Sequence, residues 1–402
     1  MTARAASQTI HAEARTVPRV AIVVGGRFVG FDIARALQRR NALAGIVSAY
    51  PRALREGIAP ELLTWNPVIG IGEAISRRLH RHRAEEISYR YSTRFARWAA
   101  RHLPEADVVQ AWTGYALEPM AAARRAGATT IAFRGSAHIR TQVELVREEF
   151  ASFGLQPPRG HDAVIERECA EYDAADMVNV ISTFARRTFI ERGFAPSRLI
   201  LTPLAVDMPE VTGSVRRTPR RGPLRVLFLG NVSLRKGVHY LLEATNALGP
   251  AAVNVSLVGG VSPDGEVILD RLATRGESKG SVPRQKLAAV FKAHDVLVLP
   301  SVEDGFGAVI CEAMAAGLPV IATENTGAPD VVHDGVDGFV VPARSARALR
   351  DALEQLVADP ARVIAMGASA AAAMAQLRTW DQFTDDMLDQ YGRARAAHTA
   401  VA

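Results

Sequence analysis

The sequence has few cysteines and no long uninterrupted apolar stretch. Only two of its 402 residues are cysteines, Cys169 and Cys311, so a disulfide framework is excluded and a reducing compartment is expected. The longest uncharged run, residues 244–263, is broken by proline, asparagine and paired glycines. We therefore expect no membrane-spanning helix. Residues 1–18 lack the apolar centre of a secretory signal.

Patterns of metal sites and of nucleic-acid binding are also missing. The sequence contains no Asp-x-Asp, and its histidines and cysteines do not cluster at ligand spacing, so we predict no metal. The net charge of +6 favours anionic partners such as nucleotides or lipid headgroups. Nucleic acid is the weakest of these candidates, because no zinc-finger spacing, aromatic-interleaved basic run or RNA-binding signature occurs.

The chain does contain enough apolar residues for two cores, with 48% hydrophobic and 22% charged residues. Short β-rich runs alternate with longer helical patterns, which predicts an α/β protein with parallel strands joined by helical crossovers. In the first half we expect strands at residues 20–24, 43–48, 108–111, 129–133 and 177–181. In the second half we expect strands at residues 225–229, 254–258, 296–299, 320–322 and 338–341.

A break in this alternation divides the chain. Proline, glycine, threonine and arginine dominate the break, which is typical of a linker. The predicted divisions are a flexible tail over residues 1–18, a Rossmann-like domain over 19–207, a linker over 208–223, a second Rossmann-like domain over 224–379, and a C-terminal helix and tail over 380–402. We expect the C-terminal helix to pack back toward the first domain. Because ligands of such sheets bind beyond the carboxyl ends of the strands, a cleft between the two domains should hold the site.

A glycine-bearing loop leads from one strand of the second half into a helix. Residues 300–319 read PSVEDGFGAVICEAMAAGLP. The backbone at Gly305 and Gly307 can approach a ligand closely. Amides at the following helix start, near Ala308 and Val309, favour an anion such as phosphate.

Two acids flank this turn, with Asp304 eight positions before Glu312. The stretch resembles the Glu-x7-Glu signature of family 4 retaining glycosyltransferases of GT-B fold, including the Gly-Phe-Gly core, the Glu-Ala-Met helix and the Gly-Leu-Pro-Val turn. The resemblance implies that Glu312 binds the donor ribose, and that Asp304 and the backbone at Phe306 and Gly307 hold hydroxyls of the transferred sugar. Asp304 departs from the family pattern, which has Glu there, although Glu303 stands beside it. The alternative is a surface turn with a helix cap.

The segment GNVSLRKG, which follows residues 225–229, resembles the Lys-Gly segment of the same family. By this resemblance Lys236, helped by Arg235, would neutralise the departing diphosphate, so no metal would be required. Gly230 and Asn231 would contact the donor, and Asn231 stands where the family often has Arg. A solvated helix start is the alternative, although cations there oppose the helix dipole.

Three more segments are assigned to the cleft by the resemblance. His138 occupies the place of a cleft histidine that would contact the donor sugar or steady positive charge near its anomeric centre; a structural histidine is the alternative. Gly25 and Gly26 end the first strand in a loop that would meet donor or acceptor phosphate, without a clean dinucleotide fingerprint. Gly280 and Val282 lie where similar enzymes place the nucleobase, ahead of a helix that we expect over residues 284–294.

A basic amphipathic helix is expected around residues 83–101. Ile87, Tyr91, Phe95 and Trp98 fall on one helical face, and a row of arginines falls on another. Such a helix could lie on an anionic membrane that carries a lipid-linked acceptor. An arginine-rich solvated face over a core stripe is the more common arrangement.

These features predict a cytoplasmic, metal-independent and cofactor-free GT-B enzyme with its first domain on the acceptor side and its second on the donor side. It would move a sugar, with retention, from a UDP- or GDP-sugar to a glycan or lipid-linked acceptor in polysaccharide or glycolipid synthesis, with peripheral contact to the inner face of the membrane. Two alternatives remain open. One is a sugar nucleotide epimerase that needs no acceptor, and the other is a non-catalytic nucleotide-sugar-binding protein, suggested by Asp304 and Asn231.

Overall fold

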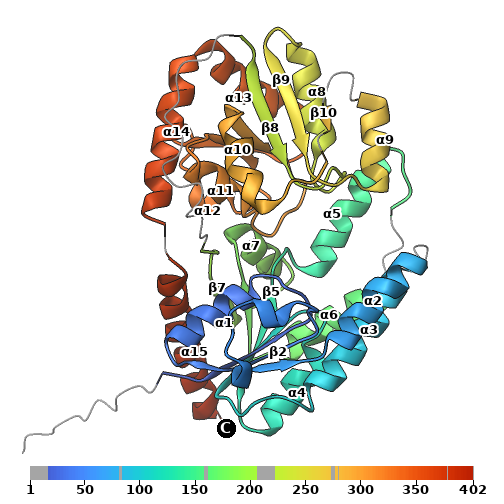
Figure 1. The fold of residues 1–402 in the computed structure, drawn as a ribbon, viewed down its shortest axis with the longest axis vertical. Helices are drawn as coiled ribbons and strands as arrows, with labels where there is room; N and C mark the ends of the chain where they lie inside the picture. The colour runs from blue at the N-terminus through green and yellow to red at the C-terminus, as the bar shows by residue number, and fades with distance from the viewer. Residues whose placement is uncertain are drawn as a thin grey trace, which may run out of the picture.

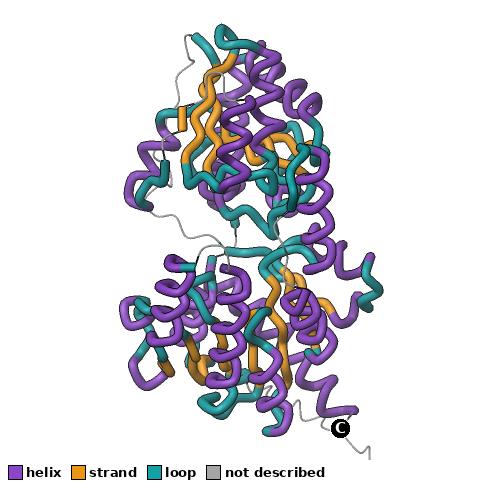
Figure 2. The backbone as a smooth tube through the Cα atoms, turned by 90° about the vertical axis from the view of Figure 1, so that its right-hand side faces the viewer, coloured by secondary structure: helices purple, strands orange, loops and turns teal. Residues whose placement is uncertain are grey.

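The protein folds around two parallel sheets, one in each half of the chain, as the computed structural model shows (Figures 1 and 2). The structure describes residues 17–80, 84–157, 162–205, 222–272, 277–278, 280–377 and 379–401. Nearly all of the predicted tail and linker therefore lies outside the described residues. The predicted arrangement of two α/β halves, each with a parallel sheet, is confirmed.

The first sheet has the strand order β3-β2-β1-β4-β5-β6-β7, and all neighbouring strands are parallel. Its strands are β1 Val20–Val24, β2 Leu43–Ser48, β3 Leu63–Trp65, β4 Val108–Trp112, β5 Thr129–Arg134, β6 Met177–Val180 and β7 Leu199–Leu201. Its helices are α1 Gly30–Arg39, α2 Pro67–Leu79, α3 Ala84–Ala99, α4 Leu117–Arg125, α5 Ile139–Ser152, α6 Asp162–Ala174 and α7 Thr183–Glu191. Helices cover both faces, so the central strands β1, β2 and β5 are buried along their whole length, and β1 reads as a continuous apolar run.

The second sheet has the order β10-β9-β8-β11-β12-β13 and is also parallel. Its strands are β8 Leu224–Leu229, β9 Val253–Val258, β10 Glu277–Ser278, β11 Val296–Leu299, β12 Val320–Thr323 and β13 Gly338–Val341. Its helices are α8 Val238–Leu248, α9 Pro263–Leu272, α10 Leu287–Lys292, α11 Val309–Ala315, α12 Ala328–Val331, α13 Ala346–Ala358 and α14 Pro360–Ala375. Ser345 and Asp359 cap the last two helices through their side chains.

The ten strands expected from the sequence all occur, with ends that differ by at most one residue. The strands β3, β7 and β10 were not predicted, because they contain three, three and two residues and are too short to show a periodic pattern. The helix expected over residues 284–294 is instead a 3-10 turn, Arg284–Lys286, followed by the six-residue α10.

The C-terminal helix α15, Trp380–Val401, returns to the first half and lies beside α1 (Figure 1). Arg40 of α1 forms ion pairs with Asp381, at 2.7 Å, and with Asp385, at 2.5 Å. The fully buried Tyr391 donates its hydroxyl to Gln110 Oε1 at 2.6 Å and approaches Asn179 Oδ1 at 3.1 Å. The predicted return of this helix to the first domain is thus confirmed.

Helix α5 belongs to the first half but reaches the second half with its C-terminal end (Figure 1). The buried Glu149 of α5 accepts hydrogen bonds from His239 Nε2 and Tyr240 Oη, both at 2.7 Å, and pairs with Arg344 at 2.9 Å. Hydrogen bonding to these groups lowers the pKa of the Glu149 carboxyl, despite its burial. A charged group on α5 therefore fastens the two halves together.

The apolar face predicted for a basic membrane helix is part of the core. Phe95 of α3 is 1% exposed, and Tyr91 packs against Gly72 and shares a hydrogen bond with Ser76 at 3.1 Å. Only the arginine side of α3 is open to solvent. Within the described ranges, no single helix is long and apolar enough to cross a bilayer; α13 and α14 pass that test only as a pair bent by 107°.

Replacing Tyr391 by Phe should lower the free energy of unfolding by about 1–2 kcal/mol, because it leaves the buried amides of Gln110 and Asn179 without the hydroxyl between them. Asp385→Asn weakens an exposed ion pair on the same helix and should cost about 0.5 kcal/mol or less. Urea unfolding of both variants measures the difference. Equal midpoints would show that the buried hydroxyl does not fasten α15.

Candidate functional site

Two loops of the second half meet at the carboxyl edge of its sheet. One runs from β8 to α8 and carries Lys236, and the other runs from β11 to α11 and carries Asp304; their side chains form an ion pair. Gly237 has a φ of 65°, and a Cβ there would lie 1.9 Å from the carbonyl oxygen of Pro300. Glycine at this position therefore lets the two loops touch. The ion pair is mostly buried, with side-chain exposures of 14% for Lys236 and 16% for Asp304.

A second acid–base pair lies next to the first. Arg235 donates from its guanidinium to Glu303 Oε2 at 3.1 Å, and its backbone carbonyl accepts from the amide of Val302 at 3.0 Å. The predicted helper cation is thus engaged with Glu303 in this structure, while Lys236 carries the charge beside Asp304.

Glu303 also connects the two halves of the molecule. Its side chain is fully buried. Its Oε1 accepts hydrogen bonds from Ser136 Oγ at 2.5 Å and from the amide of Ala137 at 3.2 Å, and its Oε2 accepts from Gln142 Nε2 at 2.9 Å. These three donors lie in the loop after β5 and at the start of α5, so one carboxylate holds the first half against the loop that carries Asp304.

Gly305 allows the two halves to approach each other this closely. A Cβ at Gly305 would lie 2.0 Å from the carbonyl oxygen of Gly135, which no side chain could occupy. The next residue, Phe306, is buried. Its ring packs against Gly327, where an added Cβ would lie 2.4 Å from the ring. Gly305 thus serves contact between the halves, in addition to any approach of a ligand to its backbone.

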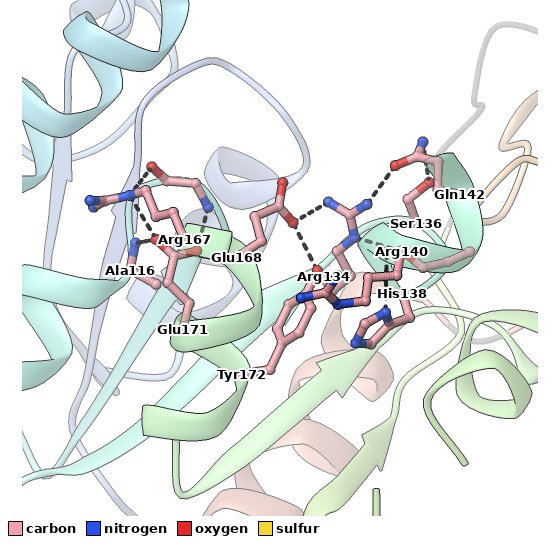
Figure 3. Close-up of polar contacts among 12 residues, drawn as sticks. Ala116, Arg134, Ser136, His138, Arg140, Gln142, Arg167, Glu168, Glu171 and Tyr172 are labelled. Atoms are coloured by element: carbon pink, nitrogen blue, oxygen red, sulfur yellow. Dashed lines mark hydrogen bonds and ion pairs between the residues drawn. The ribbon is translucent and has the colours of Figure 1, made fainter. Parts of the chain in front are cut away.

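His138, predicted to contact the donor sugar, is buried in the first half. Its ring is 3% exposed and packs against the rings of Tyr172, Phe189 and Phe194. Its Nδ1 accepts from the amide of Arg140 at 3.2 Å and caps α5 (Figure 3). Burial, with nearby arginine charge, lowers the pKa of His138 to about 4. A neutral structural histidine accounts for these contacts, and the atoms of this loop that reach Glu303 and Gly305 belong to residues 135–137.

Behind this loop runs a chain of buried polar groups (Figure 3). Arg134 donates to Glu168 Oε2 and to Gln142 Oε1, both at 2.6 Å, and to the carbonyl of Ala137 at 2.9 Å. Tyr172 donates to the same Glu168 oxygen at 2.8 Å. The chain fixes the loop over residues 135–137, because each bond removes a rotamer choice from a side chain that contacts it.

The second predicted acid, Glu312, lies on α11, and Ala308 and Val309 stand at the N-terminal end of that helix. Burial raises the pKa of the Glu312 carboxyl, opposed by the charge of Arg284 at 3.6 Å. The charge of Arg284 also acts on Asp32 of α1 in the first half. The Glu312 carboxylate thus faces the guanidinium of Arg284.

The glycines predicted to contact the donor converge at the ends of β8 and β9. The amide of Gly259 donates to the carbonyl of Gly280 at 2.9 Å, and a Cβ at Gly259 would lie 1.9 Å from the carbonyl oxygen of Gly230. A Cβ added at Gly260 would lie 3.1 Å from Asn231 Oδ1. Gly230, Asn231 and Gly280 are thus neighbours in space, although about fifty residues separate the last from the others.

The remaining predicted residues occupy separate places. Val282 is partly buried against the core of the second half. Gly25 and Gly26 follow β1 at the carboxyl edge of the first sheet, where a Cβ on Gly25 would lie 2.6 Å from the ring of Tyr115. Phe28 follows them with a φ of 27° and an exposed ring. No described contact joins Gly25 or Gly26 to Lys236.

A pocket of about 370 Å³ opens at the carboxyl end of β4 in the first half. Thr113, Gly114 and Tyr115 line it from the loop after β4, and Arg167 and Glu168 line it from α6. Glu171 supports this loop by accepting from the amides of Gly114 at 2.6 Å and Ala116 at 2.9 Å (Figure 3). Burial raises the pKa of Glu171 to about 7.

Sequence reasoning did not find the role of Glu303 or its partners Ser136 and Gln142. Glu303 was noticed only as a neighbour of Asp304. The partners lie 167 and 161 residues away in the chain, and a single sequence carries no signal for such a pairing. Only the contacts within the second half have a local hint, because two adjacent acids, Glu303 and Asp304, match two adjacent cations, Arg235 and Lys236.

The sequence is similar to those of known glycosyltransferases. Residues 223–359 match the family described as Glycosyl transferases group 1. A D-inositol 3-phosphate glycosyltransferase of Pseudarthrobacter chlorophenolicus is 30% identical over 277 residues, covering 65% of this chain and 66% of that protein. Its counterpart in Mycobacterium avium is 33% identical over 243 residues, covering 56% and 57%. The chain thus spans somewhat less than two thirds of the length of these curated relatives.

Solved structures match over nearly the whole chain. Sucrose-phosphate synthase from Thermosynechococcus elongatus has a TM-score of 0.67 at 21% identity, covering 94% of this chain and 99% of that one. Anabaena HepE in complex with UDP has a TM-score of 0.64 at 16% identity, covering 92% and 98%. The fold is that of the GT-B glycosyltransferases. Residues 223–359, in the second half, form a Glycosyl transferases group 1 domain.

Changing Glu303 to Gln should lower the free energy of unfolding by about 2–3 kcal/mol, because the new amide nitrogen would face two donors, Arg235 and Gln142, inside a buried site. Asp330→Asn is the matched control, since Asp330 also accepts from Thr183 across the halves, but at a half-buried position. We expect it to cost less than about 1 kcal/mol. Urea unfolding measures both, and equal losses would contradict a special role for Glu303.

Proposed function

We propose that the protein is a retaining, metal-independent glycosyltransferase that moves a hexose from a UDP- or GDP-sugar to a glycan or lipid-linked acceptor. The observation that carries the proposal is the Lys236–Asp304 pair at the loop junction of the second half, on the α11 loop whose helix carries Glu312. Two of the similar solved structures are of HepE with UDP and with UDP and glucose, which supports a nucleotide donor.

In the proposed reaction Lys236 binds the donor diphosphate and Asp304 binds hydroxyls of the sugar. Without a donor these two side chains neutralise each other. A diphosphate brings negative charge to Lys236 and frees the Asp304 carboxylate to accept hydroxyl hydrogen bonds. The ion pair thus keeps the two donor-binding side chains next to each other before the donor binds.

The chemical step then proceeds on one face of the sugar. The bond between the anomeric carbon and the diphosphate oxygen breaks, and the acceptor oxygen bonds to the anomeric carbon from the same side. The proton of the acceptor hydroxyl passes to the departing phosphate oxygen. Lys236 stabilises the charge that grows on that phosphate, and no protein nucleophile is assigned.

The acceptor is proposed to bind in the first half, next to the pocket at the end of β4. That pocket places hydroxyl groups and Arg167 beside the carboxylate of Glu168, which suits a hydroxylated ring. Glu168 is hydrogen-bonded to Arg134, which also bonds Ala137 of the loop that contacts Glu303. A cytoplasmic location and the absence of a cofactor are part of the same proposal.

Two tests separate this function from its alternatives. A sugar nucleotide epimerase would change the donor without an acceptor, so product analysis with and without acceptor glycans distinguishes it. A non-catalytic binding protein would bind the donor and neither transfer nor hydrolyse the sugar.

Replacing Lys236 by Ala should lower kcat by roughly 100- to 1000-fold, because one preorganised charge on the leaving group is lost. Lys292→Ala is the matched control, since Lys292 is an exposed lysine of α10. Glu312→Ala should mainly raise the donor KM, through the lost ribose contact. Initial rates of nucleotide release give kcat and the donor KM of each variant. A Glu312→Ala variant with normal kcat and KM would contradict the assignment of the donor site.

Chelation by EDTA should leave the rate of transfer unchanged, because Lys236 rather than a divalent cation holds the diphosphate. Nuclear magnetic resonance of the product should show the anomeric configuration of the donor. Loss of activity in EDTA that Mg²⁺ or Mn²⁺ restores would contradict metal independence. An inverted anomer would contradict same-face transfer.

A further inference from the structure

Helix α2 carries an apolar stripe that faces solvent. Its side chains Val68, Ile71, Ile75 and Leu79 are 74%, 45%, 54% and 71% exposed. They recur every three or four residues, which places them on one face of the helix. The described part of the chain has nine such exposed large apolar side chains, and four of them lie here. A stripe of this kind marks an interaction surface.

The opposite side of α2 is already packed, so the stripe is not an unused core face. Gly72 lies against Tyr91 of α3, where a Cβ would stand 3.1 Å from the ring. Glu73 accepts a hydrogen bond from Ser88 Oγ at 2.7 Å. The two helices lie side by side on the flank of the first half (Figure 1).

Arginines border the stripe. A groove of about 990 Å³ between α2 and α3 is lined by Val68 and by four arginines, Arg90, Arg94, Arg97 and Arg101. Arg97 lies 3.9 Å from Glu118. The other three have no ion-pair partner among the residues that the structure describes. The groove therefore presents uncompensated positive charge next to exposed apolar side chains.

The local charge balance is strongly positive. Residues 67–101 contain eight arginines and three glutamates. One of the glutamates, Glu73, is turned toward Ser88 and Arg77. Unpaired guanidinium groups in a row are suited to bind phosphate groups.

We propose that the α2 stripe and the α3 arginines form a docking surface for an anionic lipid bilayer. The apolar side chains would enter the boundary between headgroups and acyl chains, and the arginines would bind lipid phosphates. Charge complementarity favours this occupant over a second copy of the chain, which would bring a second row of arginines against the first.

The surface adjoins the acceptor pocket. Tyr89 of α3 lines both the arginine groove and the pocket at the end of β4. If the proposed transfer reaction is correct, an acceptor anchored in the bilayer would reach that pocket from the docking surface. The docking itself does not depend on the reaction.

The test is sedimentation of the full chain with vesicles of phosphatidylglycerol and phosphatidylcholine, compared with vesicles of phosphatidylcholine alone. The wild type should sediment with the anionic vesicles at low salt and be released at high salt. Replacing Arg90, Arg94 and Arg101 together by Gln should weaken the partition on the order of 100-fold, because each cation contributes about a factor of five.

The apolar part is tested separately. Ile75→Ser combined with Leu79→Ser should weaken the partition by roughly 10-fold or more, through lost apolar burial. Val336→Ser is the matched control, because Val336 is 57% exposed but lies in the second half, and it should bind as the wild type does. All of these variants should keep the thermal stabilisation that a nucleotide sugar gives, so a failure of docking and a failure of the proposed reaction can be told apart.

Three results would overturn the proposal. The first is wild-type protein that stays in solution with anionic vesicles. The second is binding that neither set of substitutions weakens. The third is a dimer in size-exclusion chromatography that the Ile75 and Leu79 substitutions dissociate, with no vesicle binding, since the stripe would then contact a second copy of the chain.

Discussion

The arrangement of the whole molecule depends on one buried carboxylate between its two halves. Glu303 receives hydrogen bonds from Ser136, Ala137 and Gln142 of the first half and from Arg235 of the second. A fully buried charge is tolerated only when its hydrogen-bonding capacity is filled, and here four donors fill it. The need to satisfy this group therefore sets how closely the loop after β5 meets the loop that carries Asp304.

Other contacts hold the halves in the same relation. Glu149 at the end of α5 meets His239, Tyr240 and Arg344 of the second half, and α15 crosses back to the first. These anchors lie away from the paired residues Lys236 and Asp304. They hold the carboxyl edges of the two sheets opposite each other. The short loops after β8 and β11 are then enough to place the donor-binding residues Lys236 and Asp304.

The sequence predicted the layers of the fold better than the contacts between them. Strand positions follow from local apolar runs, so ten strands were placed within one residue. The glycine turn at Gly305 and the candidate residues Lys236 and Asp304 follow from local motifs. The ion pair between these two side chains, which lie 68 residues apart, does not. The partners of Glu303, the burial of His138 and the exposure of the α2 stripe depend on residues far apart in the chain, and no local pattern encodes them.

The claim that the Lys236–Asp304 junction holds a nucleotide sugar is tested most directly by thermal melting with a panel of nucleotide sugars. A donor at 100 times its Kd should stabilise the protein by about 2.7 kcal/mol, so one UDP- or GDP-sugar should raise Tm by several degrees in the wild type and much less in Lys236→Ala. A panel in which no nucleotide sugar shifts Tm, or in which the variant responds as the wild type does, would contradict the account.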